Sequence, residues 1–231
     1  MPPSRNNQRK GLRARQQAES GTPGQIIAIV PRLCLATSNP GKIREYQELL
    51  KGIPFAITTP AQENIKGEPE ETGSSFEENA LLKAHYFARA LGIVSLADDS
   101  GLEVDALDGE PGIRSARYAG PEATDQERIA LLLEKLKTVP WEQRTARFRC
   151  VIALAWPSGA QETLSGSYEG YVTSQPMGYN GFGYDSVFYA PEEGSTFAEL
   201  DPATKNRLSH RGQAGHKVAK RLCNLSKAAA L

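Results

Sequence analysis

Runs of apolar residues along the chain predict the strands of a largely buried sheet. Residues 26–30 and 33–36 are almost wholly apolar, and Pro31 separates them as a break or an edge feature. Later, residues 146–156 form a long strand that is polar at its start and apolar on both faces afterwards. Residues 163–172 follow a Pro-Ser-Gly turn, so the two segments are predicted to pair as a hairpin.

Apolar residues at helical spacing predict helices between these strands. Capping residues mark four helix starts: Asn39 before Pro40, Ser75 with Glu78, Thr124 with Glu127, and Asp201 before Pro202. A closing helix is predicted around residues 214–225. Strand–helix units followed by a strand meander predict an α/β protein with a mixed sheet.

One further strand carries charge at its predicted end. Residues 93–97 are almost entirely apolar, and Asp98 and Asp99 follow them directly. Ser100-Gly101 is expected to bend the chain there, before a half-exposed strand over residues 102–105. Two adjacent carboxylates near a core repel each other and lose hydration, which favours a compensating cation such as Mg²⁺. A solvated turn is the alternative reading of this pair alone.

The composition is typical of an ordinary soluble protein, and its balanced charge gives no strong overall electrostatic field. The chain has 231 residues with 27 basic and 27 acidic side chains, which argues against stable binding to nucleic acid or to a membrane surface. No apolar run is long enough to span a membrane. The three cysteines, Cys34, Cys150 and Cys223, are far apart and are interpreted as thiols in a reducing compartment. A cytoplasmic protein is the expectation.

The first 25 residues differ from the rest of the chain. Five arginine and lysine residues face a single acidic residue, Glu19, amid Pro, Gly, Asn and Gln. Such a segment buries too little apolar surface to fold, so residues 1–25 are predicted to be a disordered basic extension. Residues 26–231 are then predicted to form the folded domain.

Four stretches carry candidate chemistry, although each also has a plain structural reading. The turn at residues 37–42 combines hydroxyls, a helix N-terminus and Lys42, which is typical of a phosphate site. Glu70 and Glu71 either complement a helix dipole or add a metal ligand beside Asp99. Residues 178–185 interleave glycines with aromatic rings that can stack on a base. His210-Arg211 supplies donors at a helix start.

Together these stretches describe a site for a Mg²⁺-bound nucleoside triphosphate, and their sequences resemble a known family. The similarity to the Ham1/RdgB-type inosine triphosphate pyrophosphatases runs from about Leu33 to the C-terminus. It rests on six motifs in order: Thr-Ser-Asn-Pro-Gly-Lys, Glu-Glu-Thr-Gly-x-x-Phe-x-Glu-Asn-Ala, Ala-Asp-Asp-Ser-Gly-Leu, Pro-Gly-x-x-Ser-Ala-Arg-Tyr, Gly-Phe-Gly-Tyr-Asp and Ser-His-Arg-Gly. Ser38 departs from this pattern, because the family more often has glycine there.

The resemblance implies roles for particular residues. Asp99 is expected to be the general base and a Mg²⁺ ligand, with Glu70 as the second ligand. The residues expected to bind substrate are Thr37, Ser38, Asn39, Pro40, Gly41, Lys42, Ser100, Phe182, Gly183, Tyr184, Asp185, Lys205, His210 and Arg211. In this reading Lys42 and Lys205 stabilise charge on the transferred or leaving group, and Asp98 has no specified role.

The resemblance also implies the architecture and the reaction. It predicts a two-lobed α/β fold with a long twisted mixed sheet, a cleft between the lobes and a homodimer. It predicts Mg²⁺-dependent hydrolysis of ITP, dITP and XTP to the monophosphate and pyrophosphate. A preference for 6-oxo purines over ATP is predicted from the donors of His210 and Arg211, which would face an acceptor O6. The alternatives are a Maf-like pyrophosphatase for other modified nucleotides, which the last two motifs disfavour, and a nucleotide- or RNA-binding module. A binding module has no need of the Glu70 and Asp99 pair.

Overall fold

The computed structural model describes residues 30–229, and from Pro31 onward the chain forms one compact unit. The predicted basic extension at residues 1–25 and most of the predicted strand at 26–30 lie outside the described residues. Within the described part, no helix is long and apolar enough to cross a membrane.

The described residues form one mixed sheet, which confirms the predicted α/β class. Its strand order is β2-β1-β3-β4-β5-β6-β7, parallel among the first three and antiparallel from β3 onward. The bounds are β1 Arg32–Leu35, β2 Ala56–Thr58, β3 Val94–Val104, β4 Thr145–Ala155, β5 Gln161–Val172, β6 Phe188–Ala190 and β7 Ser195–Thr196. The predicted hairpin is β4 and β5, which pair along their whole lengths.

The helices begin where the capping residues predict. Their bounds are α1 Pro40–Leu49, α2 Phe76–Leu91, α3 Asp125–Lys135, α4 Pro202–Leu208 and α5 His210–Ala229. The 3₁₀ segments are η1 Asp105–Leu107, η2 Gly112–Arg117, η3 Trp141–Gln143 and η4 Asp185–Val187. Thr124 and Glu127 form a complete capping box, whereas Ser75 caps α2 alone because Glu78 bonds Ser74 instead.

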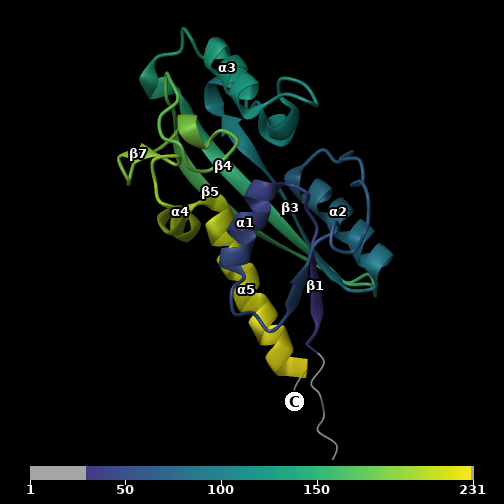
Figure 1. Ribbon diagram of the computed structural model, residues 1–231. Helices are drawn as coiled ribbons and strands as arrows, with labels where there is room; N and C mark the ends of the chain where they lie inside the picture. Colours follow the sequence, from purple (N-terminus) through teal and green to yellow (C-terminus); the bar gives the residue numbers. More distant parts are fainter. Residues whose placement is uncertain (1–29, 230–231) are drawn as a thin grey trace, which may run out of the picture. The chain divides into compact units, whose positions relative to one another are not determined.

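Strand alternation divides the core between the two faces of the sheet. Helices α1 and α5 pack on one face against Leu96, Cys150 and Ile152, and α2 packs on the other face against Ala97 and Val151 (Figure 1). A third core lies at the other end of the long strands (Figure 1). There α3 packs against the end of β3 and the start of β4, and residues of β5 and β6 belong to the same core. The described chain therefore has three hydrophobic cores distributed over one continuous sheet.

The predicted bend at Ser100-Gly101 is wrong, because β3 runs straight through it. Residues 95–104 of β3 pair without interruption with residues 146–155 of β4. Gly101 serves close packing instead of a turn. A Cβ atom there would lie 2.4 Å from the Gly112 carbonyl oxygen and 2.5 Å from Ser115 Oγ, so only glycine lets η2 approach the strand.

The opposite edge of β3 is only partly paired. Strand β1 pairs with β3 from Val94 to Leu96 and then ends. Beyond that point the Asp98 carbonyl oxygen accepts hydrogen bonds from the ammonium groups of Lys42, at 3.4 Å, and Lys83, at 3.0 Å. Beyond the carboxyl end of β1, side chains therefore take the place of a paired strand along this edge of β3. α/β proteins commonly bind ligands at such a position.

Candidate active site

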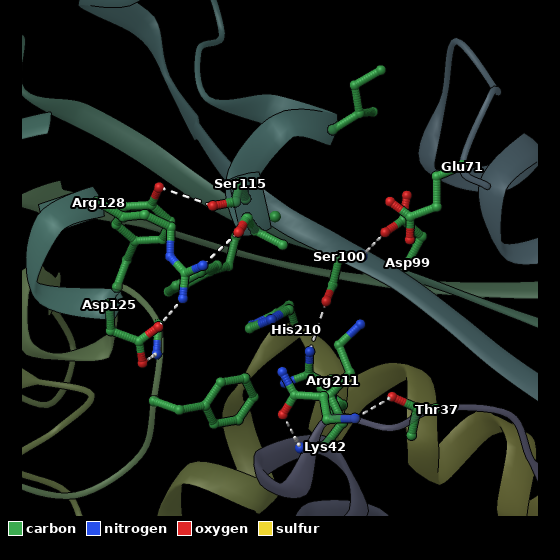
Figure 2. Close-up of a pocket in the computed structure, with 18 of the residues that line it drawn as sticks. Thr37, Lys42, Glu71, Asp99, Ser100, Ser115, Asp125, Arg128, His210 and Arg211 are labelled. Atoms are coloured by element: carbon green, nitrogen blue, oxygen red, sulfur yellow. Dashed lines mark hydrogen bonds and ion pairs between the residues drawn. The ribbon is translucent and has the colours of Figure 1, made fainter. Parts of the chain in front are cut away.

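A cavity of about 210 Å³ lies beside this strand edge. Its wall comes from the 37–42 turn, the segment before α2, the middle of β3, η2, the start of α3, residues 182–185 and the start of α5. Figure 2 shows Glu71 and Asp99 at one end of this cavity and Asp125 with Arg128 at the other. The described chain thus brings segments from both ends of the sheet to one place.

Most of the residues predicted from sequence line this cavity. They are Thr37, Ser38, Asn39, Lys42, Asp99, Ser100, Phe182, Gly183, Tyr184, Asp185, His210 and Arg211. Pro40, Gly41, Glu70 and Lys205 do not belong to its wall. Gly41 packs closely against Phe182, since a Cβ atom at position 41 would lie 2.5 Å from the Phe182 ring. The 37–42 turn can therefore contact the Phe182 ring only because residue 41 is glycine.

The structure does not bring Glu70 to Asp99, and Glu71 takes that place. Glu70 is exposed, whereas Glu71 lines the cavity. The Glu71 carboxylate accepts hydrogen bonds from Lys83 Nζ at 2.8 Å and from Arg117 at 2.7 Å. These two cations hold Glu71 inward, and its pKa is lowered because they outweigh the opposing effect of burial.

The 37–42 turn is a preorganised helix start. The Asn39 side chain accepts from the backbone N–H groups of Gly41, at 2.8 Å, and Lys42, at 3.1 Å. Thr37 Oγ1 accepts from the N–H of Asn39 at 3.1 Å, and the N–H of Ser38 donates to Glu68 at 2.7 Å. The serine at position 38 therefore sits in a hydrogen-bonded turn beside the cavity.

Asp99 lies at the acidic end in a mostly buried position. Asn79 Nδ2 donates to its Oδ2 at 3.1 Å, and Lys83 Nζ lies 3.8 Å from its Oδ1. Burial raises the pKa of Asp99, and the opposing effects of Lys83 and Lys42 do not cancel that rise. A carboxylate with a raised pKa, facing a cavity, has the properties of a general base.

Asp98 points to the other face of the sheet and is fully enclosed. Lys42 Nζ lies 2.9 Å from its Oδ1, and Arg211 Nε donates to its Oδ2 at 3.1 Å. Burial raises the pKa of Asp98, but Lys42 and Arg211 outweigh burial and hold the pKa well below its usual range. Asp98 therefore stays ionised.

Lys205 supports the aromatic end of the cavity from outside. Its ammonium donates to Glu45 Oε1 at 2.8 Å and also to Asp185. It lies 5.0 Å from the centroid of the Phe182 ring, and the Arg211 guanidinium lies 5.3 Å from the same centroid. The ring therefore rests on two cations that Glu45 bridges.

His210 is a neutral, enclosed side chain at this end. Its ring stacks on Phe148 with 4.5 Å between centroids and 10° between planes. Burial lowers the pKa of His210 well below its usual value, and Arg211 and Lys205 lower it further. Within the described residues, its buried Nδ1 atom has no hydrogen-bond partner. A neutral imidazole that lines a cavity can recognise a polar group on a ligand.

The Ham1 family model matches residues 33–221 of this chain. The chain belongs to the Ham1 family. It is 50% identical over 183 residues to a dITP/XTP pyrophosphatase of Geobacter sulfurreducens, which covers 79% of this chain and 92% of the relative. It is 44% identical over 196 residues to a dITP/XTP pyrophosphatase of Bacillus subtilis, covering 85% and 99%.

Solved structures of the Ham1 family share the fold. A HAM1 protein from Coxiella burnetii matches with a TM-score of 0.77 and 43% identity, covering 84% of this chain and 99% of that one. The Staphylococcus aureus Ham1 protein matches with a TM-score of 0.73 and 39% identity, covering 83% and 97%.

Several residues of this Ham1-family site escaped the sequence reasoning. Asn79 and Lys83 had a usable signal, because they are polar residues four positions apart on the apolar face of α2. Asp125 doubles as the first residue of α3 and as acceptor for the Gly183 N–H at 2.6 Å, which no local pattern indicates.

The acidic end of this Ham1-family chain has a donor set that fits Mg²⁺. Within residues 30–229, no three His, Cys, Asp or Glu side chains are grouped to hold a metal ion by themselves. Mg²⁺ typically takes one or two carboxylates and completes its shell with water and substrate phosphates. Glu71 and Asp99 offer two carboxylates near one ammonium, that of Lys83. Their oxygen chemistry suits a cation that arrives with phosphate.

Proposed function

We propose that this chain hydrolyses non-standard purine nucleoside triphosphates (ITP, dITP and XTP) to the monophosphate and pyrophosphate. The observation that carries the proposal is the division of one cavity into two ends. Glu71 and Asp99 lie at one end, and Asp125 and Arg128 lie at the other (Figure 2). Lys83 contacts both carboxylates at the first end. At the second end Gly183, the neighbour of Phe182, donates its N–H to Asp125. The names of the relatives support dITP and XTP as substrates.

In this proposal the 37–42 turn binds the triphosphate. The N-terminal end of α1 carries a partial positive charge, and Lys42 adds a full one. Lys42 also keeps its contact with Asp98, so its ammonium is held near the phosphate end before substrate arrives. Lys205 is assigned a supporting role under Phe182, because its ammonium is already engaged by Glu45 and Asp185.

Asp99 orients and deprotonates the attacking water. Its hydrogen bond from Asn79 fixes one carboxylate oxygen, and the other faces Lys83 at 3.8 Å. Glu71 and Asp99 are the residues that would hold Mg²⁺, in place of the Glu70 and Asp99 pair expected from sequence. The ion, when bound, would neutralise phosphate charge and so lower the barrier to hydrolysis.

The purine is recognised by stacking and by donors around its six-position oxygen. Phe182 offers a ring, and His210 presents a neutral imidazole beside it. Arg211 uses one N–H toward each of Asp98, Glu45 and Ser100, which leaves two of its five donors for a base oxygen. A 6-amino purine offers a donor there instead of an acceptor, so ATP is a poor substrate.

The test is a pyrophosphate-release assay on ITP, XTP, dITP, GTP, ATP and dUTP, with and without Mg²⁺. The expected result is Mg²⁺-dependent release with kcat/KM for ITP far above that for ATP. The Asp99→Asn variant serves as the background control. Equal kcat/KM for ITP and ATP would remove the base specificity, and binding of nucleotides without any release would favour a binding module.

We further propose that the protein acts as a homodimer in the cytoplasm. The support is the family resemblance together with three cysteines that are unpaired in the described chain. Light scattering of the purified protein distinguishes a dimer of 25.1 kDa chains from a monomer.

A further inference from the structure

Asp98 is the one member of the acidic pair with no part in the proposed chemistry. Strand alternation turns its side chain away from Asp99, and the side chain is completely buried. Asp98 does not line the cavity, so it cannot touch substrate. A role in the reaction must therefore act through its partners.

Three of its four side-chain partners reach the cavity wall, and these three come from separate segments, whereas the fourth, Cys150 Sγ at 3.7 Å, does not line the cavity. Oδ1 of Asp98 pairs with Lys42 of α1 at 2.9 Å. Oδ2 accepts from Arg211 Nε of α5 at 3.1 Å and from Ser100 Oγ of β3 at 3.4 Å. Arg211 closes the cluster by donating from its Nη2 to Ser100 Oγ at 2.7 Å. One carboxylate thus fixes three cavity-lining groups at once.

The three partners serve different ends of the site. In the proposed function Lys42 and Ser100 belong to the phosphate end, because Lys42 lies in the 37–42 turn and Ser100 donates its N–H to Asp99 Oδ1 at 3.1 Å. Arg211 lies under the Phe182 ring at the base end. A second anchor, Glu45, accepts from Arg211 Nη1 at 2.8 Å but contacts neither Lys42 nor Ser100 in the described chain. Among these anchors, Asp98 alone connects the two ends.

We propose that Asp98 is a positioning residue that couples the two ends of the nucleotide site. It holds Lys42 and Ser100 toward the triphosphate and Arg211 toward the base from a single buried anion. This inference rests on the proposed function, since it assigns the two ends to phosphate and base. Loss of the Asp98 charge is expected to weaken binding at both ends together.

The test measures direct binding, which does not depend on turnover. Calorimetry gives the Kd of pyrophosphate, for the phosphate end, and of inosine 5′-monophosphate, which also reaches the base end. Asp98→Asn keeps the side-chain shape and is expected to raise both Kd values about tenfold or more, because contacts to charged groups are lost. Lys42→Gln is expected to act mainly on pyrophosphate, and Phe182→Leu mainly on the monophosphate.

Asp105→Asn is the matched control. Asp105 is a carboxylate just beyond the end of β3 that pairs with Arg147 at 2.9 Å, with 43% of its side chain exposed. Its removal is expected to leave both Kd values unchanged. An Asp98→Asn protein with wild-type Kd values for both ligands, or with only one Kd raised, would overturn the coupling.

A second variant covers the case in which Asp98→Asn fails to fold. The double variant Asp98→Asn/Lys42→Gln removes one anion and one cation together, so the buried cluster keeps its net charge. Its Kd for inosine monophosphate is expected to exceed that of Lys42→Gln alone, because Arg211 has lost its anchor. Equal Kd values in these two variants contradict the proposal. Failure of the wild-type protein to bind either ligand would instead contradict the proposed function.

Discussion

Asp98 and Asp99 are neighbours in sequence, yet they stand in opposite environments. Asp98 faces α1 and α5, where Lys42 and Arg211 contact it directly, and its pKa is held well below the usual range against the effect of burial. Asp99 faces α2, where its closest cation, Lys83, stands 3.8 Å away, and burial leaves its pKa raised. A single step along a β-strand separates a fixed anion from a carboxylate that can exchange a proton.

This difference shows how one strand can carry both a residue that positions other side chains and a residue that takes part in the reaction. Carboxylates whose environments push their pKa values apart are the ones that take distinct roles in acid–base reactions. Here alternation of side chains produces that separation without any change in backbone direction. The α5 face supplies rigid charge, and the α2 face supplies the reactive group.

The largest expected effect on stability comes from a substitution in the buried charge cluster on the α5 face of the sheet. Arg211→Met removes a buried guanidinium that pairs with Asp98 and Glu45, leaving both anions less compensated. Breaking a buried pair in this way costs about 3–5 kcal/mol of unfolding free energy. Urea unfolding at pH 7.5 measures it. Lys137→Ala, which removes an exposed pair with Glu134, is the control and is expected to change nothing measurable. Wild-type stability in Arg211→Met would remove the contrast between the faces.

A second substitution, on the α2 face, tests how Lys83 controls the pKa of Asp99. Lys83 lowers the pKa of Asp99, although less than burial raises it. Lys83→Met is therefore expected to raise that pKa further. Because the base must be ionised to act, activity is lost at a higher pH as the solution is acidified, and the acid limb of kcat/KM moves upward in pH. Lys83→Arg, which keeps a cation, should restore the limb toward its original position. An unmoved limb in the Met variant would show that Lys83 does not control Asp99.

The smallest effect concerns the pH dependence of stability on the α5 face. The folded-state pKa of His210 lies well below its usual value, so the folded protein keeps this ring neutral. The unfolded chain binds a proton below about pH 6.5, and unfolding becomes easier as pH falls from 7.5 to 5.5, by at most about 1.4 kcal/mol per pH unit.

His210→Phe preserves stacking on Phe148 and should reduce that slope, as measured by urea unfolding at several pH values. His216→Gln, at an exposed position of the same helix, is expected to keep the wild-type slope. Identical slopes in all three proteins would mean that His210 does not remain neutral in the folded state.

The local features that sequence predicts well are those set by neighbouring residues. Asn39 before Pro40 and Thr124 with Glu127 start helices because their side chains accept from N–H groups two or three residues later. Such contacts depend only on spacing along the chain. The motifs of the 37–42 turn and of residues 181–185 likewise contributed eight residues to the cavity wall.

The features that sequence missed are set by contacts between distant segments. Ser100-Gly101 has the composition of a turn, yet pairing with β4 and the approach of η2 keep the strand straight. Glu71 and Glu70 look equivalent in sequence, and only Lys83 and Arg117 distinguish them. Lys205 has the charge of a phosphate ligand, but Glu45, 160 residues away, holds it beneath an aromatic ring.

The contrast between the two aspartates can be tested most directly by steady-state turnover of ITP by Asp99→Asn and Asp98→Asn, measured side by side. Asp99→Asn is expected to lower kcat by about 10²–10⁴-fold while its thermal unfolding stays near wild type, since the isosteric amide leaves the fold intact. Asp98→Asn is expected to act chiefly on KM, with a far smaller loss in kcat. A wild-type kcat in Asp99→Asn, or a kcat loss in Asp98→Asn as deep as that in Asp99→Asn, would contradict the division of roles between the two faces of β3.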